Sequence, residues 1–263
     1  MTAQELVRLG DLPQALQALQ EQIKRQPDDP KLRVFLFQLN CVLGRFDKAL
    51  TQLQVMASLD AELALLAQIF RPVITCEALR AEVFAGKRTA LIFGEPTEWI
   101  GWLVQAAALA AQGQVAAATE LQQRAFEAAP ATPGTIDGQS FDWIADADSR
   151  LGPLLEVILD GKYYWIPFCR IVRMEIEKPT DLRDLVWIPV RFTWTNGGAA
   201  TGHVPARYPN TEHAPEDALR LARKTLWQEL GPDYYVGCGQ RVLTANVGEF
   251  PVLDCRRLEM AAT

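Results

Sequence analysis

The side chains that most often carry catalysis or bind metals are scarce in this sequence of 263 residues. Histidine occurs only twice, at His203 and His213. A histidine-based catalytic triad or a multi-histidine metal site therefore has too little material, because each needs histidine beside other reactive groups or several histidines together. We expect both histidines to be surface or loop residues.

The cysteines form neither a metal-binding nor a disulfide pattern. They are odd in number, widely spaced and never arranged as Cys-x-x-Cys. The five are Cys41, Cys76, Cys169, Cys238 and Cys255. Zinc sites use closely spaced cysteines, and disulfide frameworks use an even number in secreted proteins. We therefore expect five buried, inert thiols in a reducing compartment.

One acidic cluster invites a calcium interpretation. Its members are Asp142, Asp146, Asp148 and Glu156. An EF-hand loop counted from Asp146 needs glycine at position six and a carboxylate at position twelve, but Leu151 and Val157 stand there. Capping or solvation by Asp146, Asp148 and Ser149 is the favoured role, and a bound cation is the alternative.

Nucleotide-binding motifs are also missing. Gly237-Cys238-Gly239 has Val242 where the third glycine of the dinucleotide fingerprint would stand, and no P-loop sequence occurs. The sequence therefore predicts no cofactor, no metal and no enzymatic activity. The rival interpretation is an enzyme or ligand-binding protein whose second half acts on a small molecule.

Composition places the chain among folded cytosolic proteins. Hydrophobic residues make up 49% and charged residues 22%, and the formal net charge is −6. Both halves are acidic, so neither offers a basic face to nucleic acid. No stretch reaches the roughly 18 apolar residues of a membrane helix, and the N-terminus lacks a signal-peptide pattern. We expect a cytoplasmic protein that binds neither nucleic acid nor membrane.

The elements that must position any binding site change character near residue 130. All five tyrosines and five of the seven tryptophans lie beyond it. The stretch 129–134 contains two prolines and a glycine, which end helices. We therefore predict two domains, residues 1–130 and residues 135–263.

The first half repeats itself at the period of a tetratricopeptide repeat (TPR). The segment 10–19 aligns with 44–53 at an offset of 34 residues, sharing Gly, Ala, Leu and Leu. A third copy begins at Gly113. Between copies, 61–84 predicts two helices interrupted at Arg71-Pro72. We expect about eight helices in an irregular superhelix.

Such helical stacks have a concave face that usually binds a peptide or a helix. The repeat register predicts which side chains point into it. They are Lys31, Val34, Gln38, Cys41, Leu103 and Ala107. These residues either bind a partner or pack against neighbouring helices, and the sequence leaves both possibilities open.

The second half alternates short apolar runs with turn signals. Asp160-Gly161, between Leu155–Leu159 and Lys162–Ile166, predicts a β-hairpin. A strand over 187–195 should return over 203–208. A helix is expected from Pro215 to the Gly231-Pro232 stop, and two last strands over 241–246 and 250–255. This pattern indicates an α+β domain with a curled antiparallel sheet.

Several blocks of the second half resemble one family. They are Asp146–Pro153, Gly161–Phe168, Pro179–Trp187 and Arg207-Tyr208-Pro209. They resemble the ImpE/TagJ (SciE-type) accessory proteins of type VI secretion. The resemblance implies a bacterial cytoplasmic non-enzyme that contacts the small subunit of the contractile sheath and helps recruit the AAA+ ATPase that dismantles it.

The resemblance and the missing motifs together favour an adaptor that binds a helix or peptide of a secretion component. Two alternatives remain. One is the small-molecule enzyme named above, and the other is a homo-oligomeric spacer whose groove is occupied by its own chain.

Overall fold

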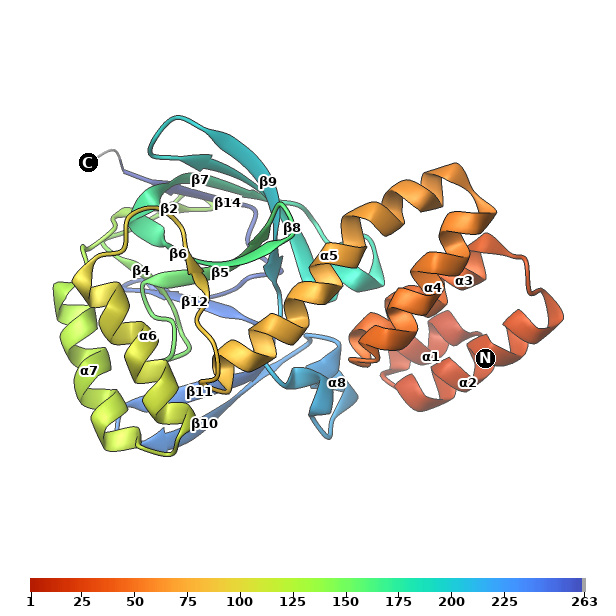
Figure 1. Ribbon diagram of the computed structural model, residues 1–263, viewed down its shortest axis with the longest axis horizontal. Helices are drawn as coiled ribbons and strands as arrows, with labels where there is room; N and C mark the ends of the chain where they lie inside the picture. Colours follow the sequence, from red (N-terminus) through yellow and green to blue (C-terminus); the bar gives the residue numbers. More distant parts are fainter. Residues whose placement is uncertain (262–263) are drawn as a thin grey trace.

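The computed structural model describes residues 1–261 and has a helical lobe at one end and a sheet-rich body at the other (Figure 1). The predicted fold class, helical repeats followed by an α+β half, is confirmed. The helices are α1 Ala3–Leu9, α2 Leu12–Arg25, α3 Pro30–Val42, α4 Phe46–Leu59, α5 Ala61–Phe84, α6 Glu98–Ala111, α7 Val115–Ala128 and α8 Asp217–Arg220. Short 3-10 helices are η1 Phe168–Arg170, η2 Leu182–Leu185 and η3 Thr211–His213.

Most strands follow the helices in the chain, except that β1 precedes α6 and that α8 lies between β9 and β10. They are β1 Leu91–Ile92, β2 Gly134–Ile136, β3 Gln139–Phe141, β4 Ile144–Asp146, β5 Leu154–Leu159, β6 Lys162–Pro167, β7 Ile171–Ile176, β8 Trp187–Trp194, β9 Ala199–Pro205, β10 Thr225–Gly231, β11 Tyr234–Gly239, β12 Val242–Ala245, β13 Gly248–Pro251 and β14 Arg257–Met260. Helix therefore gives way to strand between Ala128 and Gly134. The division into two domains at that point stays a prediction.

Local signals explain where the first helices begin and turn. Asp11 and Asp29 cap α2 and α3 by accepting hydrogen bonds from backbone N–H groups of the first turn. Gly10 and Gly44 adopt positive φ angles between consecutive helices, a conformation that costs glycine little. The helix–turn–helix units predicted from the 34-residue period are present at α1–α2 and α3–α4.

The predicted break at Arg71-Pro72 is wrong, because residues 61–84 form one helix, α5, of 24 residues. Pro72 lies inside it, although proline removes one hydrogen bond from a helix. The buried neighbours Phe70, Val73 and Ile74 hold this stretch in the core, so packing outweighs the local cost. Residues 1–130, all of which the structure describes, therefore contain seven helices and not the expected eight.

A large, mostly antiparallel sheet dominates the body. Its strand order is β1-β6-β5-β9-β8-β7-β14-β2-β3, and smaller sheets are formed by β10-β11 and by β13-β12-β4. The predicted hairpin at Asp160-Gly161 is confirmed, since Leu159 pairs with Lys162 and both turn residues have positive φ. The strand over 187–194 also pairs with a return strand, which begins at Ala199 and not at His203.

The helix predicted from Pro215 to Leu230 is wrong beyond its first turn. Helix α8 ends at Arg220, and Ala222 has a positive φ that stops helical continuation. Thr225–Gly231 forms β10, which pairs with β11 across the Pro232-Asp233 turn. Pairing along the whole of β10 thus outweighs an apolar spacing that suits a helix.

The last strands are also shifted from their predicted positions. Strands β12 and β13 pair across Asn246-Val247, because Ala245 is opposite Gly248. Residues 257–260 then form β14, an interior strand between β7 and β2. Strand β14 is absent from the sequence prediction.

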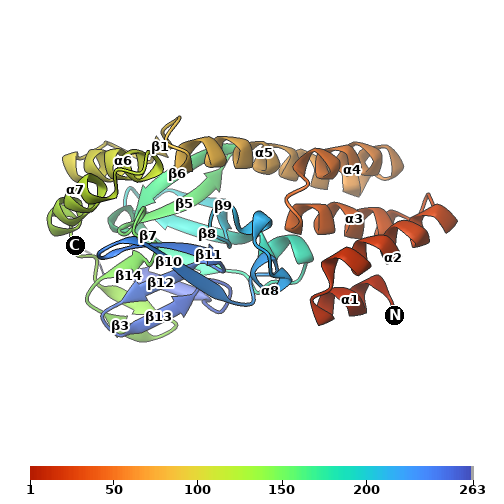
Figure 2. The same cartoon turned by 90° about the horizontal axis from the view of Figure 1, so that it is seen from below.

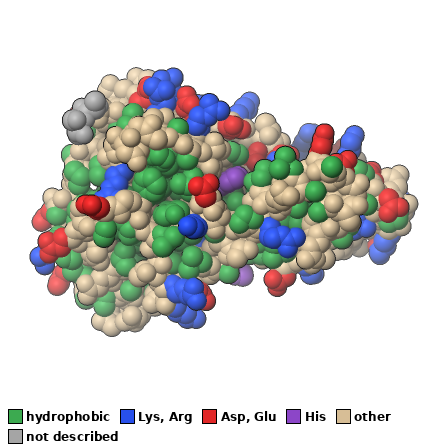
Figure 3. Space-filling model, turned by 45° about the horizontal axis from the view of Figure 1, so that its top comes forward, with side chains coloured by type: hydrophobic (Ala, Val, Ile, Leu, Met, Phe, Trp, Pro, Cys, Tyr) green, Lys and Arg blue, Asp and Glu red, His purple; other side chains and the backbone are tan. Residues whose placement is uncertain are grey.

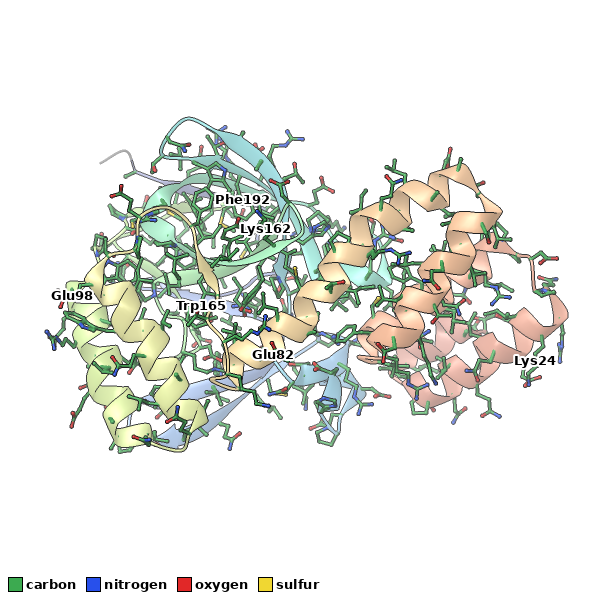
Figure 4. The ribbon with its side chains drawn as sticks, in the orientation of Figure 1. Lys24, Glu82, Glu98, Lys162, Trp165 and Phe192 are labelled. Atoms are coloured by element: carbon green, nitrogen blue, oxygen red, sulfur yellow. The ribbon has the colours of Figure 1, made fainter. Side chains whose placement is uncertain are left out.

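The helices and the sheet share one hydrophobic core. A single cluster of buried side chains contains Leu6 and Phe37 from the helical lobe together with Trp165 and Trp187 from the sheet. In Figure 2, helices α4, α5 and α6 line up along one side of the molecule, with the strands beneath α5 and α6. Trp165 belongs to this shared core, whereas Phe192 belongs to a second cluster within the body (Figure 4).

One histidine is more buried than expected, and two of the cysteines are less buried. His213 is exposed in η3 as predicted, but His203 lies half-buried on β9 with its ring edge-on to Phe70 at 5.3 Å. Burial lowers the pKa of His203 to about 4. Cys169 and Cys238 are only half-buried, so the expectation of five buried thiols holds for the other three.

A buried ion pair fixes α5 to the sheet. Arg80 of α5 donates to both carboxylate oxygens of Glu156 on β5, at 2.6 and 3.1 Å. Arg80 is 4% exposed and Glu156 is fully buried. The same guanidinium also donates to the carbonyl of Arg207 at 2.7 Å. Because a bidentate arginine–carboxylate pair tolerates little change in geometry, this contact helps to fix the position of α5 over the β5–β6 hairpin.

Glu156 also takes part in a wider buried network. It accepts hydrogen bonds from Arg241 and, at 2.5 Å, from the hydroxyl of Tyr163. Burial by itself raises the pKa of Glu156, but the charges of Arg80 and Arg241 outweigh burial and lower this pKa to about 2. Glu156 is therefore a permanently charged structural anion at neutral pH.

The acidic cluster singled out in the sequence belongs to the same buried region. Asp146 pairs with Arg241, and Asp148 pairs with Arg150 at 2.6 Å. Both aspartates also accept backbone N–H groups in the loop after β4, but no helix begins there, so the predicted helix capping is wrong. The expected solvation is wrong, because Asp146 is 3% exposed and Asp148 is fully buried.

Replacing Glu156 with glutamine should destabilise the protein strongly. The change leaves Arg80 and Arg241 without their shared anion in a buried site, and breaking such a pair typically costs about 3–5 kcal/mol. Chemical denaturation followed by circular dichroism would measure the free energy of unfolding. Glu82→Gln is the matched control, because its pair with Arg88 is exposed and should be worth about 0.5 kcal/mol or less. Equal effects of the two changes would contradict the structural role of Glu156.

The stability difference between the wild type and Glu156→Gln should depend on pH. Because the pKa of Glu156 is lowered from its usual 4.5 to about 2, its contribution is fully present above its unfolded-state pKa and is lost as pH falls toward the folded-state pKa. The difference should therefore be largest above about pH 5 and shrink by about pH 3. Denaturation of both proteins at a series of pH values checks this, and a difference that grows on acidification would refute it.

Candidate partner-binding groove

A groove opens on the helical lobe where α3 faces the beginning of α5. Its volume is about 410 Å³. Its lining residues are Gln4, Pro30, Lys31, Val34, Phe35, Gln38, Asp60, Glu62, Leu63 and Asp181. Most come from α3 and from the start of α5, so capping of those helices by Asp29 and Asp60 also shapes the groove.

Three of the six residues predicted from the repeat register meet in this groove. Lys31, Val34 and Gln38 lie at spacings of three and four residues on α3 and therefore share one helix face. Lys31 is exposed and Val34 is half-buried, whereas Gln38 is only 5% exposed. The predicted stripe on α3 therefore lies along the groove, and its accessible part is Lys31 and Val34.

The other three predicted residues lie away from the groove. Cys41 is fully buried at the end of α3, near Arg207, and burial raises the pKa of its thiol. Leu103 is fully buried in the shared core. Ala107 is 4% exposed and lines a separate cavity beside Trp165. In this conformation none of the three offers its side chain to a partner at the groove.

The length of α5 explains why the third repeat unit does not extend this concave face. A helix of 24 residues is about 36 Å long, and α5 carries the chain from the helical lobe to the body. Helices α6 and α7 therefore pack at the far end of the molecule (Figure 1). The expected irregular superhelix therefore does not run through all the helices, and the groove belongs to the first four helices and the start of α5.

A segment of the sheet half closes one end of the groove. The side-chain amide of Gln38 donates to Asp181 at 3.0 Å, and its oxygen accepts from the backbone N–H of Leu182 at 3.2 Å. Arg183 pairs with Asp181 at 2.5 Å, and its guanidinium lies 4.8 Å from the centre of the Phe70 ring. Buried Gln38 therefore links α3 to η2, because its side-chain amide both donates and accepts a hydrogen bond there.

The groove has an apolar floor and a mainly acidic rim. Val34, Phe35 and Leu63 are partly buried and pack against the shared core. Around them stand three carboxylates and one ammonium group. These are Asp60, Glu62, Asp181 and Lys31. An apolar strip with an acidic margin is complementary to an amphipathic segment that carries basic residues.

Sequence reasoning missed part of this site. Leu63 and Phe35 carry no signal in the sequence beyond the hydrophobicity of their helices. Asp181 lies more than a hundred residues from α3 in the chain. Its position in the groove depends on packing between the two halves, which no local pattern reveals.

The buried carboxylates of the body belong to ion pairs, and Asp146 also lines a cavity of about 540 Å³ beside Trp143. Glu156, Asp146 and Asp148 are each bound by an arginine. Within residues 1–261 the structure shows no group of three or more histidine, cysteine or acidic side chains placed to hold a metal. Among the same residues, no helix is long and apolar enough to cross a membrane.

Comparison with known proteins identifies relatives of both halves. A tetratricopeptide repeat model matches residues 6–69, and the model of the ImpE protein matches residues 138–259. The type VI secretion system accessory component TagJ of Pseudomonas aeruginosa is 48% identical over 263 residues, which are 100% of this chain and 92% of that protein. These matches confirm the resemblance found in the sequence blocks.

A solved structure shares the whole fold. The crystal structure of a protein from Vibrio parahaemolyticus superimposes with a TM-score of 0.88 at 28% identity. The match covers 99% of this chain and 98% of that chain. The arrangement of helical lobe and body is therefore shared between the two proteins.

Replacing Gln38 with alanine should loosen the closed end of the groove. The change removes both hydrogen bonds to η2 and leaves the N–H of Leu182 without a partner, at a cost of about 1–3 kcal/mol. Hydrogen exchange should show faster exchange at Leu182, and denaturation should show the lost stability. Gln123→Ala, at an exposed position of α7, is the control and should change neither. An unchanged exchange rate at the N–H of Leu182 would contradict this role of Gln38.

Proposed function

This chain belongs to the ImpE/TagJ family of type VI secretion accessory components, and we propose that it is a non-enzymatic adaptor that binds the small subunit of the contractile sheath. In this proposal the protein works in the bacterial cytoplasm. It holds an amphipathic segment of that subunit in the groove between α3 and α5, and so helps recruit the AAA+ ATPase that dismantles the sheath.

The observation that carries the proposal is the pairing of an apolar floor with an acidic rim in the groove. Tetratricopeptide-like helices commonly bind peptides or helices on such faces. Burying apolar side chains of a partner against Val34, Phe35 and Leu63 would supply affinity, at about 25 cal/mol per Å² removed from water. The rim carboxylates Asp60 and Glu62 would favour a basic partner and set its orientation.

The state of Glu156 supports an adaptor, whereas burial raises the pKa of Asp146 to about 6. General acid–base catalysis needs a carboxyl group that can reach a substrate and exchange a proton near neutral pH. Glu156 is enclosed by Arg80, Arg241 and Tyr163, and its pKa is lowered to about 2. Its environment is that of a structural ion pair.

The surface of the molecule is consistent with a protein that binds other proteins. Figure 3 shows hydrophobic side chains gathered in patches on one face, with basic and acidic side chains interspersed among them. Isolated exposed apolar residues are ordinary, but patches bordered by charges mark many contact surfaces. Leu65 and Ile69, one turn apart on α5, are 59% and 44% exposed and add apolar surface to the helical lobe.

Val34→Asp should reduce binding of the small sheath subunit much more than it reduces stability. A charge in the middle of the apolar floor should cost about 2 kcal/mol or more in binding, roughly thirtyfold in affinity. Because Val34 is half-buried, the free energy of unfolding should fall by only about 1 kcal/mol. Isothermal titration with purified sheath subunit and a denaturation curve measure the two effects.

The matched control is Val247→Asp, which places the same charge in the exposed turn between β12 and β13. It should leave both affinity and stability unchanged. If Val34→Asp melts normally and binds the sheath subunit as tightly as the wild type, the groove is not the binding site. Binding by neither the wild type nor the control would reject the sheath subunit as the partner.

A further inference from the structure

The β10–β11 hairpin leaves one long strand edge uncovered. In Figure 1 it passes beneath the lower ends of α6 and α7. Strand β10 pairs with β11 on one side, and the two-stranded sheet ends there. Among residues 1–261, no backbone group elsewhere in the chain bonds to Trp227 or Glu229. An edge of this kind is a template for another extended chain.

The hydrogen bonds of β11 show which groups of β10 face outward. Tyr235 and Gly237 bond with the loop after β4, through the Ser149 and Asp148 side chains, each at 2.9 Å. Their N–H groups therefore point away from β10. In an antiparallel pair, two residues directly opposite each other either both direct their backbone N–H and C=O groups toward the other strand or both direct them away from it. Since Tyr235 is opposite Glu229 and Gly237 is opposite Trp227, these two β10 residues direct their backbone groups to the open edge.

The edge has few of the usual protections against pairing, apart from a bulge between Glu229 and Gly231 at its end. Natural edge strands are often short, or carry proline or lysine that blocks association. From Leu226 to Leu230, β10 contains neither, and its one charge is Glu229. Leu226 is 46% exposed and Tyr235, on the neighbouring strand, is 40% exposed. Apolar side chains thus accompany the free backbone groups.

The sequence of β10 is complementary to itself. Around Gln228 the order is Leu226, Trp227, Gln228, Glu229, Leu230, so each leucine lies two residues from the centre. A two-fold axis at Gln228 would place Leu226 opposite Leu230 of the other copy and Trp227 opposite Glu229. It would avoid placing like charges directly opposite each other, which destabilises strand pairs.

We propose that β10 is a homodimer interface, in which it pairs antiparallel with β10 of a second copy about a two-fold axis at Gln228. The outward N–H and C=O groups of Trp227 in each copy then bond with those of Glu229 in the other copy. The result is one sheet in the order β11-β10-β10-β11. Leu226 of the second copy would extend the apolar cluster that Leu230 and Val236 form against α6 and α7. The proposal is independent of which partner the α3–α5 groove binds.

The first test is the oligomeric state of the full chain by sedimentation velocity. The wild type should form a dimer that dissociates on dilution, starting from about 0.5 mM, where even a millimolar self-association would be visible. Glu229→Pro removes an N–H that faces away from β11, so the hairpin should survive, because proline is tolerated where an edge N–H faces outward. Self-association should weaken at least about tenfold. Glu229→Ala keeps the N–H and should still dimerise, and circular dichroism verifies that both variants are folded.

A second variant keeps the proposal testable if Glu229→Pro fails to fold. Gln228→Cys places two thiols across the axis in a non-hydrogen-bonded pair, where Cβ atoms come about 4.5–5.5 Å apart and a disulfide can form after a small adjustment. Mild oxidation should give a covalent dimer joined through residue 228, identified by peptide mapping. The wild type and Gln123→Cys, exposed on α7, should not cross-link efficiently.

Three results would overturn the proposal. A wild type that stays monomeric at about 0.5 mM shows that the edge does not pair with itself. A dimer that a folded Glu229→Pro leaves unchanged shows that the interface lies elsewhere. A dimer in which Gln228→Cys forms no bond through residue 228 excludes the two-fold register at Gln228.

Discussion

The contact of Arg80 with Glu156 is the constraint on which the rest of the structure depends. Burying an unpaired charge in a protein interior costs much free energy, so a fully buried glutamate needs hydrogen-bond donors around it in the folded state. Glu156 on β5 finds Arg80 on α5, Tyr163 on β6 and Arg241 beside β12. These donors come from three separate parts of the sequence, and the pairing is satisfied only when helix and sheet halves are docked in one orientation. The large apolar core shared by both halves then supplies stability, while the ion pair selects the orientation.

This docking determines the shape of the candidate binding site. Because α5 is held over the sheet as one unbroken helix, η2 of the sheet half reaches α3 and Gln38 can bond with Asp181 and Leu182. The concave face that a tetratricopeptide-like stack would offer is therefore partly occupied by the protein's own chain. What stays accessible is the shorter groove beside Lys31, Val34 and Leu63. Its closed end is part of the body, so a segment bound there would meet both halves of the molecule.

Local patterns predicted the elements whose cause is local. Asp160-Gly161 has the positive φ angles that its dipeptide favours, and Gly10 and Gly44 end their helices as the repeat period indicated. Where the prediction was wrong, a long-range contact decided the outcome. Pro72 stays helical because Phe70, Val73 and Ile74 are buried around it, and 225–231 is a strand because β11 pairs with it.

For the candidate site, the repeat register indicated Lys31, Val34 and Gln38 but not Asp181. Asp181 reaches the groove only through the packing of the fold, since it bonds with Gln38, 143 positions away in the chain. The buried network was equally out of reach, because Arg80 and Glu156 lie 76 positions apart.

The groove and the open edge of β10 lie on different parts of the molecule, one on the helical lobe and the other below α6 and α7 (Figure 1). The two surfaces therefore do not compete for space within one chain. Two copies joined at β10 would carry two grooves at a fixed separation, because the buried ion pairs and the shared core hold the helical lobe, with α3, against the body, with β10. Binding at the second groove would then take place at a high effective concentration, provided that the partner presents its segment repeatedly at a matching distance. A weak individual groove, of the size seen here, is sufficient for firm attachment to a repetitive assembly under that condition, whereas an isolated copy of the partner would be held only weakly.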